Sequence, residues 1–322
     1  MSILAVVLIH TTTRVLEQTG YNLNNYPLTL FFNQAARFAV PMFFLISGFV
    51  LQLHYHLNES FIHFLKKRFS KVFLPFLFWS FIYYYFVYTN HNSSFLSALL
   101  SGNASYQLYF IPSLLIFYLI FPLLNRFYKY FANPVFLITV GALQLYFLYQ
   151  DYFVGHYKFY FPLVIFMFNF FTFLLGMVVS KNQEKTISFL NRISYLLPVA
   201  VFAFAYYIFK EGKDLYLKTY DIGKFYSQWR PDVLIYTMFV SGLIYEFFVK
   251  TDFEHNFVKK LSKLSFFVYF VHVLILEIFW EYLRHYTSYF GFGAILFICV
   301  SLGSFLIAAL IHKIPKISKI TG

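Results

Sequence analysis

Charged residues are scarce in this 322-residue chain, and cysteine is almost missing. Asp, Glu, Lys and Arg make up only 12% of the residues, where soluble domains hold about a quarter, so the composition argues against a water-soluble globular protein. The aromatic share of 25% excludes a disordered chain, because disordered chains are rich in charge and poor in aromatic residues. The one cysteine, Cys299, excludes a disulfide scaffold and a zinc site built from cysteines.

Motifs that define common enzyme sites are also missing. The chain contains no GxxxxGK[ST] phosphate loop, no HExxH metal motif and no GxSxG nucleophile elbow. We therefore expect no bound metal, and no nucleotide or hydrolase site of those kinds.

Long apolar runs take up most of the chain, which is 60% hydrophobic. A helix needs about 20 mostly apolar residues to cross a bilayer, and the runs predict about ten such helices. They cover residues 2–16, 34–53, 72–89, 109–124, 134–150, 161–180, 193–209, 233–249, 264–283 and 293–312. The runs lack the alternating polarity of barrel strands. We predict an all-α integral membrane protein with one transmembrane domain over residues 1–322 and no soluble domain.

Positive charge predicts the orientation in the membrane. The chain has 25 Lys and Arg against 13 Asp and Glu, and most of the basic residues fall in alternate loops. These are Lys66, Lys67, Arg68 and Lys71; Arg126 and Lys129; Lys181, Lys185 and Arg192; and Lys250, Lys259, Lys260 and Lys263. The positive-inside rule places these loops and both termini in the cytoplasm, although the basic loop 210–232 then lies outside. Because this rule accounts for the excess charge, we expect no nucleic-acid partner.

Ionisable residues within the spans are candidates for function, since they are costly in lipid. They are His10, Arg14, Arg37, Glu246, His272, Glu277 and Glu281. Arg14, Arg37, Glu246 and Glu281 lie near span ends, where we expect them to extend toward water. His10 and Arg14 are four residues apart and share a helix face, which predicts a polar stripe facing the bundle interior. His272, near Tyr269 and Glu277, has either a functional role or a structural one, through packing or a helix–helix hydrogen bond.

The basic cluster at residues 66–71 has two interpretations. It either anchors the protein against anionic lipid headgroups or holds phosphate groups by charge-assisted hydrogen bonds. Ser47 and Gly48 predict a close approach between helices. The aromatic stretches 106–110 and 152–160 fit either an interfacial belt or stacking on sugar rings.

Several segments resemble the membrane acyltransferase 3 family. Residues 4–10, ending at His10, are similar to the end of its first-helix motif, which is an arginine, ten further residues and then a histidine; that arginine would fall just before Met1. Residues 37–49, from Arg37 through Ser47 and Gly48, resemble the second-helix signature. Arg68 and Lys71, followed by Pro75, resemble an Arg-x-x-Arg motif, with lysine in the second place. The others are Tyr109–Pro112 with Tyr118 and Pro122, and residues 264–272, which end at His272.

The resemblance covers nearly the whole chain, in the family's order. It implies transfer of an acyl group, usually acetyl, from acyl-CoA to a sugar hydroxyl, in a multi-pass bacterial plasma-membrane protein. His10 would act as general base, and Arg68 and Lys71 would hold the phosphates of the donor. Arg37, Ser47, Tyr109 and His272 would support the site or bind substrate.

The resemblance also sets the expected partners. Acetyl-CoA would be a donor substrate, with no bound cofactor, and the acceptor would be a carbohydrate. Membrane lipids and the polysaccharide synthesis or export machinery would be the other partners, because the chain looks most like stand-alone members associated with surface polysaccharides.

Two other functions fit the residues. An exporter of polysaccharide or lipid-linked sugar would also use proline-broken helices and buried polar groups. A sensor or scaffold subunit would need His10 and Arg68 only for insertion. Loss of acyl transfer on replacing His10, with normal insertion, separates the enzyme from both.

Overall fold

The computed structural model describes residues 2–19, 26–55, 60–89, 93–155, 160–216, 222–251, 256–314, 317 and 320–322. Within these ranges every regular element is a helix, so the all-α prediction is confirmed for the described part of the chain. The chain forms two compact units, here called the first unit and the second unit. The first unit comprises Met1–Phe43 and Gln183–Ala308, and the second comprises Phe44–Asn182 and Ala309–Gly322.

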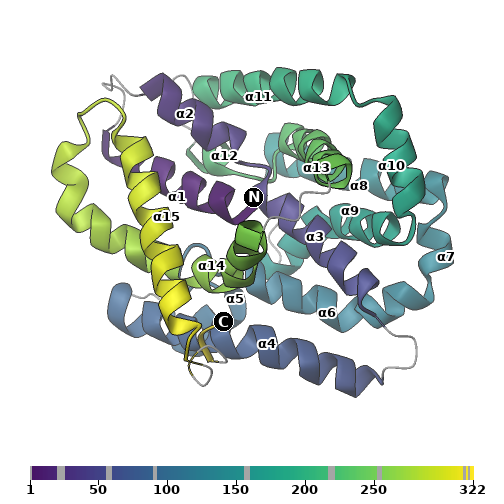
Figure 1. Ribbon diagram of the computed structural model, residues 1–322, viewed down its shortest axis with the longest axis horizontal. Coiled ribbons are helices and arrows are strands. Elements are labelled where there is room, and N and C mark those ends of the chain that lie inside the picture. The colour runs from purple at the N-terminus through teal and green to yellow at the C-terminus, as the bar shows by residue number, and fades with distance from the viewer. Residues whose placement is uncertain are drawn as a thin grey trace. The chain divides into compact units, whose positions relative to one another are not determined.

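Figure 1 labels the helices, which are distributed between the units as follows. The first unit contains α1 (Ser2–Thr19), α2 (Tyr26–Ala35), α10 (Gln183–Arg192), α11 (Leu196–Asp214), α12 (Ile222–Tyr226), α13 (Pro231–Thr251), α14 (Asn256–Leu283) and most of α15 (Phe292–Ile311). The second contains α4 (Phe61–Ile82), α5 (Phe95–Ser101), α6 (Phe110–Arg126), α7 (Tyr128–Phe131), α8 (Pro134–Phe153) and α9 (Phe161–Lys181). Helix α3 (Ala39–Leu53) begins in the first unit and ends in the second.

Each expected span coincides with a helix, but not every helix is long and apolar enough to cross a membrane by itself. Among the described residues six pass that test, or up to seven if α10 and α11, bent by 79° to one another, form one span. The six are Pro27–Leu53, Phe61–Val87, Phe161–Lys181, Lys224–Thr251, Val258–Tyr286 and Phe292–Ile311. A protein with several membrane spans is therefore supported, whereas ten crossings and cytoplasmic termini stay predictions.

Helix α4 begins well before the span expected at residues 72–89. The side chain of Ser60 caps its first turn by accepting a hydrogen bond from the backbone N–H of His63. Such a cap satisfies one of the donors that a helix start leaves without a partner. The basic residues 66–71 are consequently helical, and a π-helical turn (Tyr83–Val87) extends the helix at its other end.

Small residues bring α1 against α2 and the start of α3 in the first unit. Ala5, Val6 and Ile9 form a buried cluster with Ala36 and Ala39. Because alanine side chains are short, the backbone of α1 lies close to the turn that joins α2 to α3. This packing fixes the face of α1 that carries its polar residues.

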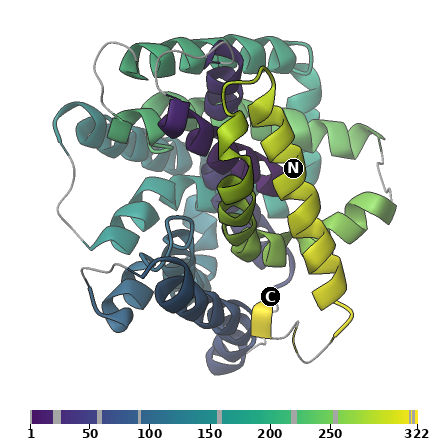
Figure 2. The same ribbon diagram turned by 90° about the vertical axis from the view of Figure 1, so that its left-hand side faces the viewer.

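Helix α15 lies beside α14 in the first unit, as the turned view in Figure 2 shows. Gly303 on α15 faces Ile275 and Phe279 of α14, where an added Cβ would lie only 3.1 Å from the Phe279 ring. The contact packs α15 against the part of α14 that follows His272.

Glycines bring α3 and α9 into backbone contact in the second unit. A Cβ added to Gly48 would lie 2.1 Å from the carbonyl oxygen of Phe173, and one added to Gly176 would lie 2.0 Å from that of Leu45. Real Cβ atoms do not come so near to a carbonyl oxygen, so only glycine fits at either position. The predicted close approach at Gly48 is confirmed.

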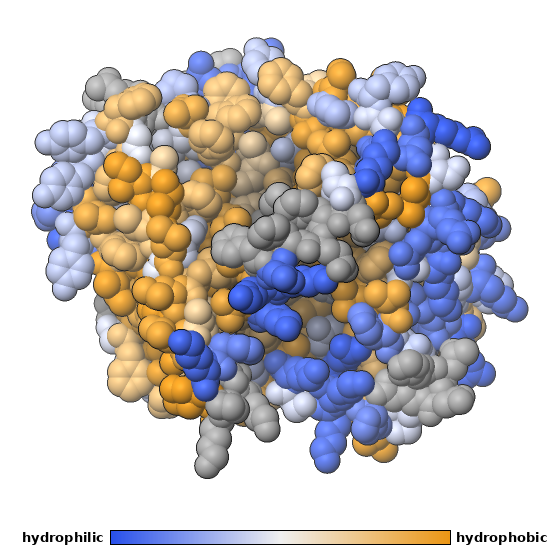
Figure 3. All heavy atoms as spheres, in the orientation of Figure 1, coloured by the Kyte–Doolittle hydropathy of each residue, from blue (hydrophilic) through white to orange (hydrophobic). Residues whose placement is uncertain are grey.

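The outer face of α15 is hydrophobic, and Figure 3 shows this stripe. Its exposed large side chains are Ile295, Ile298, Leu302, Leu306 and Leu310. Contiguous exposed apolar surface on this scale marks a membrane or protein contact, and along an apolar helix of 20 residues it fits contact with lipid.

Candidate functional site

Polar residues of α1 form the first part of the candidate site. The hydroxyls of Thr11 and Thr12 donate to the carbonyl oxygens of Val7 and Ile9, at 2.9 and 3.1 Å. These bonds let threonine lie inside an apolar helix without an unsatisfied donor. His10 and Arg14 lie on the same helix, as the sequence predicts.

His10 is half-buried and faces His272 of α14. The two ring centroids are 5.3 Å apart, and the rings are tilted by 33°. In the sequence each histidine stands out as an ionisable residue in an apolar run, but nothing there indicates that the two are in contact. The structure places them side by side within the first unit.

The tautomer of His272 follows from its hydrogen bond. Its Nδ1 lies 3.0 Å from the carbonyl oxygen of Val268, and a carbonyl oxygen only accepts, so Nδ1 carries the proton. Nε2 is then the acceptor nitrogen of a neutral ring. The residue is 0% exposed, and Nε2 has no hydrogen-bond partner in the described part of the chain.

An ion pair lies beyond the histidines along the same two helices. Arg14 donates to a carboxylate oxygen of Glu277 at 3.0 Å, and its guanidinium lies 5.3 Å from the Trp280 ring centroid. The pairs His10–His272 and Arg14–Glu277 follow in the same order along α1 and α14. This second contact fixes the register of the two helices at the histidines.

Asn33 of α2 links α1 to the residues that follow α2. Its Nδ2 donates to the hydroxyl oxygens of Thr12 and Thr13, at 2.9 and 3.0 Å. Its Oδ1 accepts from the Arg37 guanidinium and from the side-chain amide of Gln34. One amide therefore ties the polar stripe of α1 to a buried cation.

Arg37 does not extend toward water, so the prediction made for it is wrong. It is 2% exposed, and besides Asn33 it donates to the carbonyl oxygen of Tyr226. The physical reason is that fixed acceptors from α2 and α12 replace water around the guanidinium. Glu246 departs from its prediction in the same way, because it is buried and paired with Lys250.

Arg230 is a member of this site that sequence analysis missed. It is 0% exposed, donates to Asp232 through two nitrogens at 3.1 and 2.6 Å, and donates to Oε1 of Gln34 at 3.0 Å. From the sequence it was predicted to be one of several basic residues in loop 210–232, part of which (217–221) lies outside the described residues. Asp232, two positions away, was the available signal, because a fixed carboxylate is what a buried arginine needs.

These residues lie on α1 or contact one of its residues, directly or through one another, and we call them the histidine cluster. It comprises His10, Thr12, Thr13, Arg14, Asn33, Gln34, Arg37, Arg230, Asp232, His272 and Glu277. The cluster offers two imidazoles for proton transfer, with guanidinium groups within the same unit. Such a set can move a proton in a site that is largely shielded from water.

The other predicted site residues lie in the second unit. Arg68 is half-buried, with its guanidinium 5.8 Å from the Phe64 ring, and Lys71 is exposed one turn further along α4. Tyr109 is half-buried just before α6, with its ring 6.0 Å from that of Phe161. Ser47 is half-buried next to Gly48. That these residues join the histidine cluster in one site stays a prediction.

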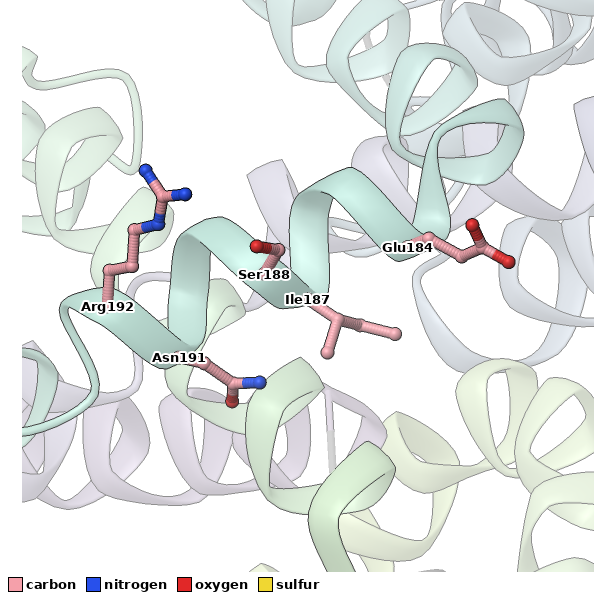
Figure 4. A pocket seen from close by; sticks show the side chains of 5 residues that line it. All are labelled: Glu184, Ile187, Ser188, Asn191 and Arg192. Carbon is pink, nitrogen blue, oxygen red and sulfur yellow. The ribbon is translucent and has the colours of Figure 1, made fainter.

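A pocket of about 560 Å³ lies along α10. Figure 4 shows its lining side chains on this one helix, with Glu184 and Arg192 near opposite ends and Ile187, Ser188 and Asn191 between them. None of the five belongs to the histidine cluster. The pocket therefore adds nothing to the proton-transfer site.

Comparison with known proteins places the whole chain in one group. A family model described as "Acyltransferase domain" matches residues 1–312. A relative from Staphylococcus aureus (strain N315), named as a probable poly-beta-1,6-N-acetyl-D-glucosamine export protein, is 26% identical over 316 residues, which are 92% of this chain and 85% of the relative. A Staphylococcus epidermidis protein of the same name is 25% identical over 326 residues, 92% of this chain and 83% of that protein. No solved structure matches.

Proposed function

The chain belongs to the acyltransferase domain family whose model spans residues 1–312, and from that premise we propose that it moves an acetyl or other short acyl group from cytoplasmic acyl-CoA to a carbohydrate hydroxyl. The family and the apolar helices support a multi-pass bacterial membrane acyltransferase. The donor, the acceptor and the catalytic roles are our proposal. The observation that carries it is the contact between half-buried His10 and fully buried His272 within a polar cluster.

His10 acts as the general base in this mechanism. It removes the proton of the acceptor hydroxyl while that oxygen attacks the thioester carbonyl carbon. The new C–O bond forms, the C–S bond breaks, and the departing thiolate takes the proton from His10 to give free CoA. A positioned base of this kind contributes about 10²- to 10⁴-fold to the rate.

Arg37 supports His10 by holding the helices around it. Arg37 donates to Asn33, and Asn33 in turn donates to Thr12 and Thr13, which lie within one turn of His10. A base held in one position loses less freedom when the reaction occurs. Arg37 is therefore a positioning residue here.

The basic stretch of α4 binds the donor. Lys66, Lys67 and Lys71 are exposed and Arg68 is half-buried on one short helical segment, where their charges can meet the phosphates of acyl-CoA. The ammonium group of Lys71 can attract a phosphate as a point charge, whereas the guanidinium of Arg68 can form a bidentate hydrogen bond with it. The other interpretation, an anchor against lipid headgroups, predicts no effect on the donor's KM.

A polysaccharide is the acceptor that the relatives favour. Two of them, 25–26% identical to this chain, are named for poly-beta-1,6-N-acetyl-D-glucosamine. That polymer exposes sugar hydroxyls, the nucleophile that the proposed reaction needs. The same names speak of export, so transport of the polymer is the second candidate function.

Acyl transfer in membranes distinguishes the two functions. Membranes that contain the protein receive [acetyl-¹⁴C]CoA and poly-beta-1,6-N-acetylglucosamine, and label in the polymer is counted for the wild type, His10→Ala and His54→Ala. His54 is an exposed histidine with a backbone bond of the same kind as that of His272, so its variant should behave as the wild type. We expect His10→Ala to reduce labelling by at least about 10²-fold with unchanged insertion. No label from inserted wild-type protein, together with lost surface polymer in a deletion strain, would favour the exporter.

A further inference from the structure

We propose that His272 is a positioning residue that accepts a hydrogen bond from His10 when His10 holds the proton of the acceptor hydroxyl. The proposal rests on the function above and assigns a task to the second histidine. It starts from the Nε2 atom of His272, which is buried without a hydrogen-bond partner in the described structure.

A buried polar atom without a partner is costly. Burial without a hydrogen bond destabilises the folded protein, and such atoms in native proteins call for a reason. Packing alone gives none, because an apolar residue would fill the same space without this cost. A role in catalysis does give a reason, if the acceptor atom has no donor before the reaction and receives a hydrogen bond during it.

The geometry identifies the donor that fills it. Nδ1 of His272 is committed to the carbonyl oxygen of Val268, so only Nε2 remains to accept. The His10 ring lies 5.3 Å away, centroid to centroid, and the proposed bond forms when this ring turns one of its nitrogens toward Nε2. A neutral imidazole has one N–H and takes a proton on its other nitrogen, so the nitrogen of His10 that faces the acceptor hydroxyl takes the proton, and the N–H on the opposite nitrogen is the one donated to Nε2 of His272.

The bond therefore strengthens during the reaction. In the resting state His10 is neutral, and Nε2 of His272 has no cation to face. After proton transfer, the imidazolium of His10 carries a charge in a poorly solvated site, where a charge-assisted bond is about twice as strong as a neutral one. Interactions made in the transition state but not before it are the ones that raise kcat.

The charged neighbours already have partners of their own. Arg14 on α1 is bound to Glu277 on α14, and Arg37 donates to Asn33 and Tyr226. The carboxylate of Glu277 is thus committed one turn beyond the histidines. His272 is the group that faces His10 with a vacant acceptor.

The test replaces His272 by residues of similar size that do or do not accept a hydrogen bond. Labelling of the polymer is measured as above for the wild type, His10→Ala, His272→Gln and His272→Leu, each corrected for the amount inserted. We expect His272→Leu to lower kcat by about 10²-fold, with KM for acetyl-CoA nearly unchanged, and His272→Gln to retain several-fold more activity. His54→Leu is the matched control, and it should retain wild-type activity.

A second arm separates basicity from packing. His272→Gly leaves a space beside His10 that either imidazole or pyrazole can enter, and pyrazole is the same size but a far weaker base. Restoration by imidazole and not by pyrazole is expected. The proposal would be overturned if His272→Gln and His272→Leu had equal activity. It would also be overturned if imidazole and pyrazole restored the activity of His272→Gly equally, or if neither restored it. If the wild type transfers nothing, the proposed function falls as well, whereas transfer that depends on His10 alone removes only the role of His272.

Discussion

Arginine is almost never fully buried unless it is paired, and the first unit buries both Arg37 and Arg230. Both donate hydrogen bonds to groups that the fold holds in place. Gln34 and Asn33, neighbours on α2, accept one guanidinium each. The polar core around α2 is thus built from arginine and amide side chains in pairs.

Replacing Arg230 should be much more damaging than replacing a surface arginine. Arg230→Ala removes the cation from the Asp232 carboxylate, which keeps only the backbone N–H of Val233, and the donor from Oε1 of Gln34; breaking such a buried pair costs about 3–5 kcal/mol. Arg284 pairs with Glu281 at the surface, and Arg284→Ala should cost less than about 1 kcal/mol. Thermal unfolding of both variants in detergent checks this. Equal midpoints would show that the Arg230 network contributes little to stability.

The sequence reveals some of these residues better than others. His10, Arg37 and His272 stand out because ionisable groups in apolar runs are rare. Arg230 lies outside such a run, so the sequence indicates only a basic residue in a loop. The contact between His10 and His272, 262 positions apart in the chain, follows from how α1 meets α14, and one sequence contains no record of that packing.

Helices were predictable where they are apolar and not where they are polar. Hydropathy located every expected span on a helix, but α10 and α12 were taken as loops. Helix α10 is amphipathic, with Leu190 buried and Lys185 exposed, and its many polar residues hide it from a search for apolar runs. The start of α4 was placed too late for the same reason, since residues 66–71 are basic.

The α3–α9 contact should not tolerate alanine. Gly176→Ala places a Cβ about 2 Å from the carbonyl oxygen of Leu45, so the helices must separate and lose packing, a class of change that costs typically about 1–3 kcal/mol and occasionally more. Gly293→Ala in α15 is the control, because its Cβ would meet only Thr29 at an ordinary 3.4 Å. The measurements are the inserted yield and the unfolding temperature. A Gly176→Ala protein as stable as Gly293→Ala would show that the two helices can move apart without cost.

Orientation is a property of the whole molecule that the charge pattern predicts. The net charge of +12 reflects basic loops assigned to the cytoplasm, among them Lys185 on α10. The stretch 106–110 is assigned to the outside. In this orientation the two positions lie on opposite sides of the membrane.

Cysteine labelling tests the orientation directly. Cys299 is the one cysteine of the chain, so Cys299→Ala provides a background without thiols. Lys185→Cys and Tyr106→Cys then place single thiols at exposed positions. On intact cells, a membrane-impermeant maleimide should label the thiol at 106 and not that at 185 until the cells are opened. The opposite pattern would invert the predicted topology.

The α3–α9 contact at Gly48 and Gly176 also has a genetic consequence. Every single-base missense change in a glycine codon introduces a residue with a Cβ, so neither codon has a neutral missense neighbour. The atoms that such a Cβ would meet belong to the backbone of Phe173 and Leu45, and no substitution at those two positions removes a carbonyl oxygen. Second-site suppressors of a glycine mutation should therefore arise elsewhere on α3 or α9, or not arise at all.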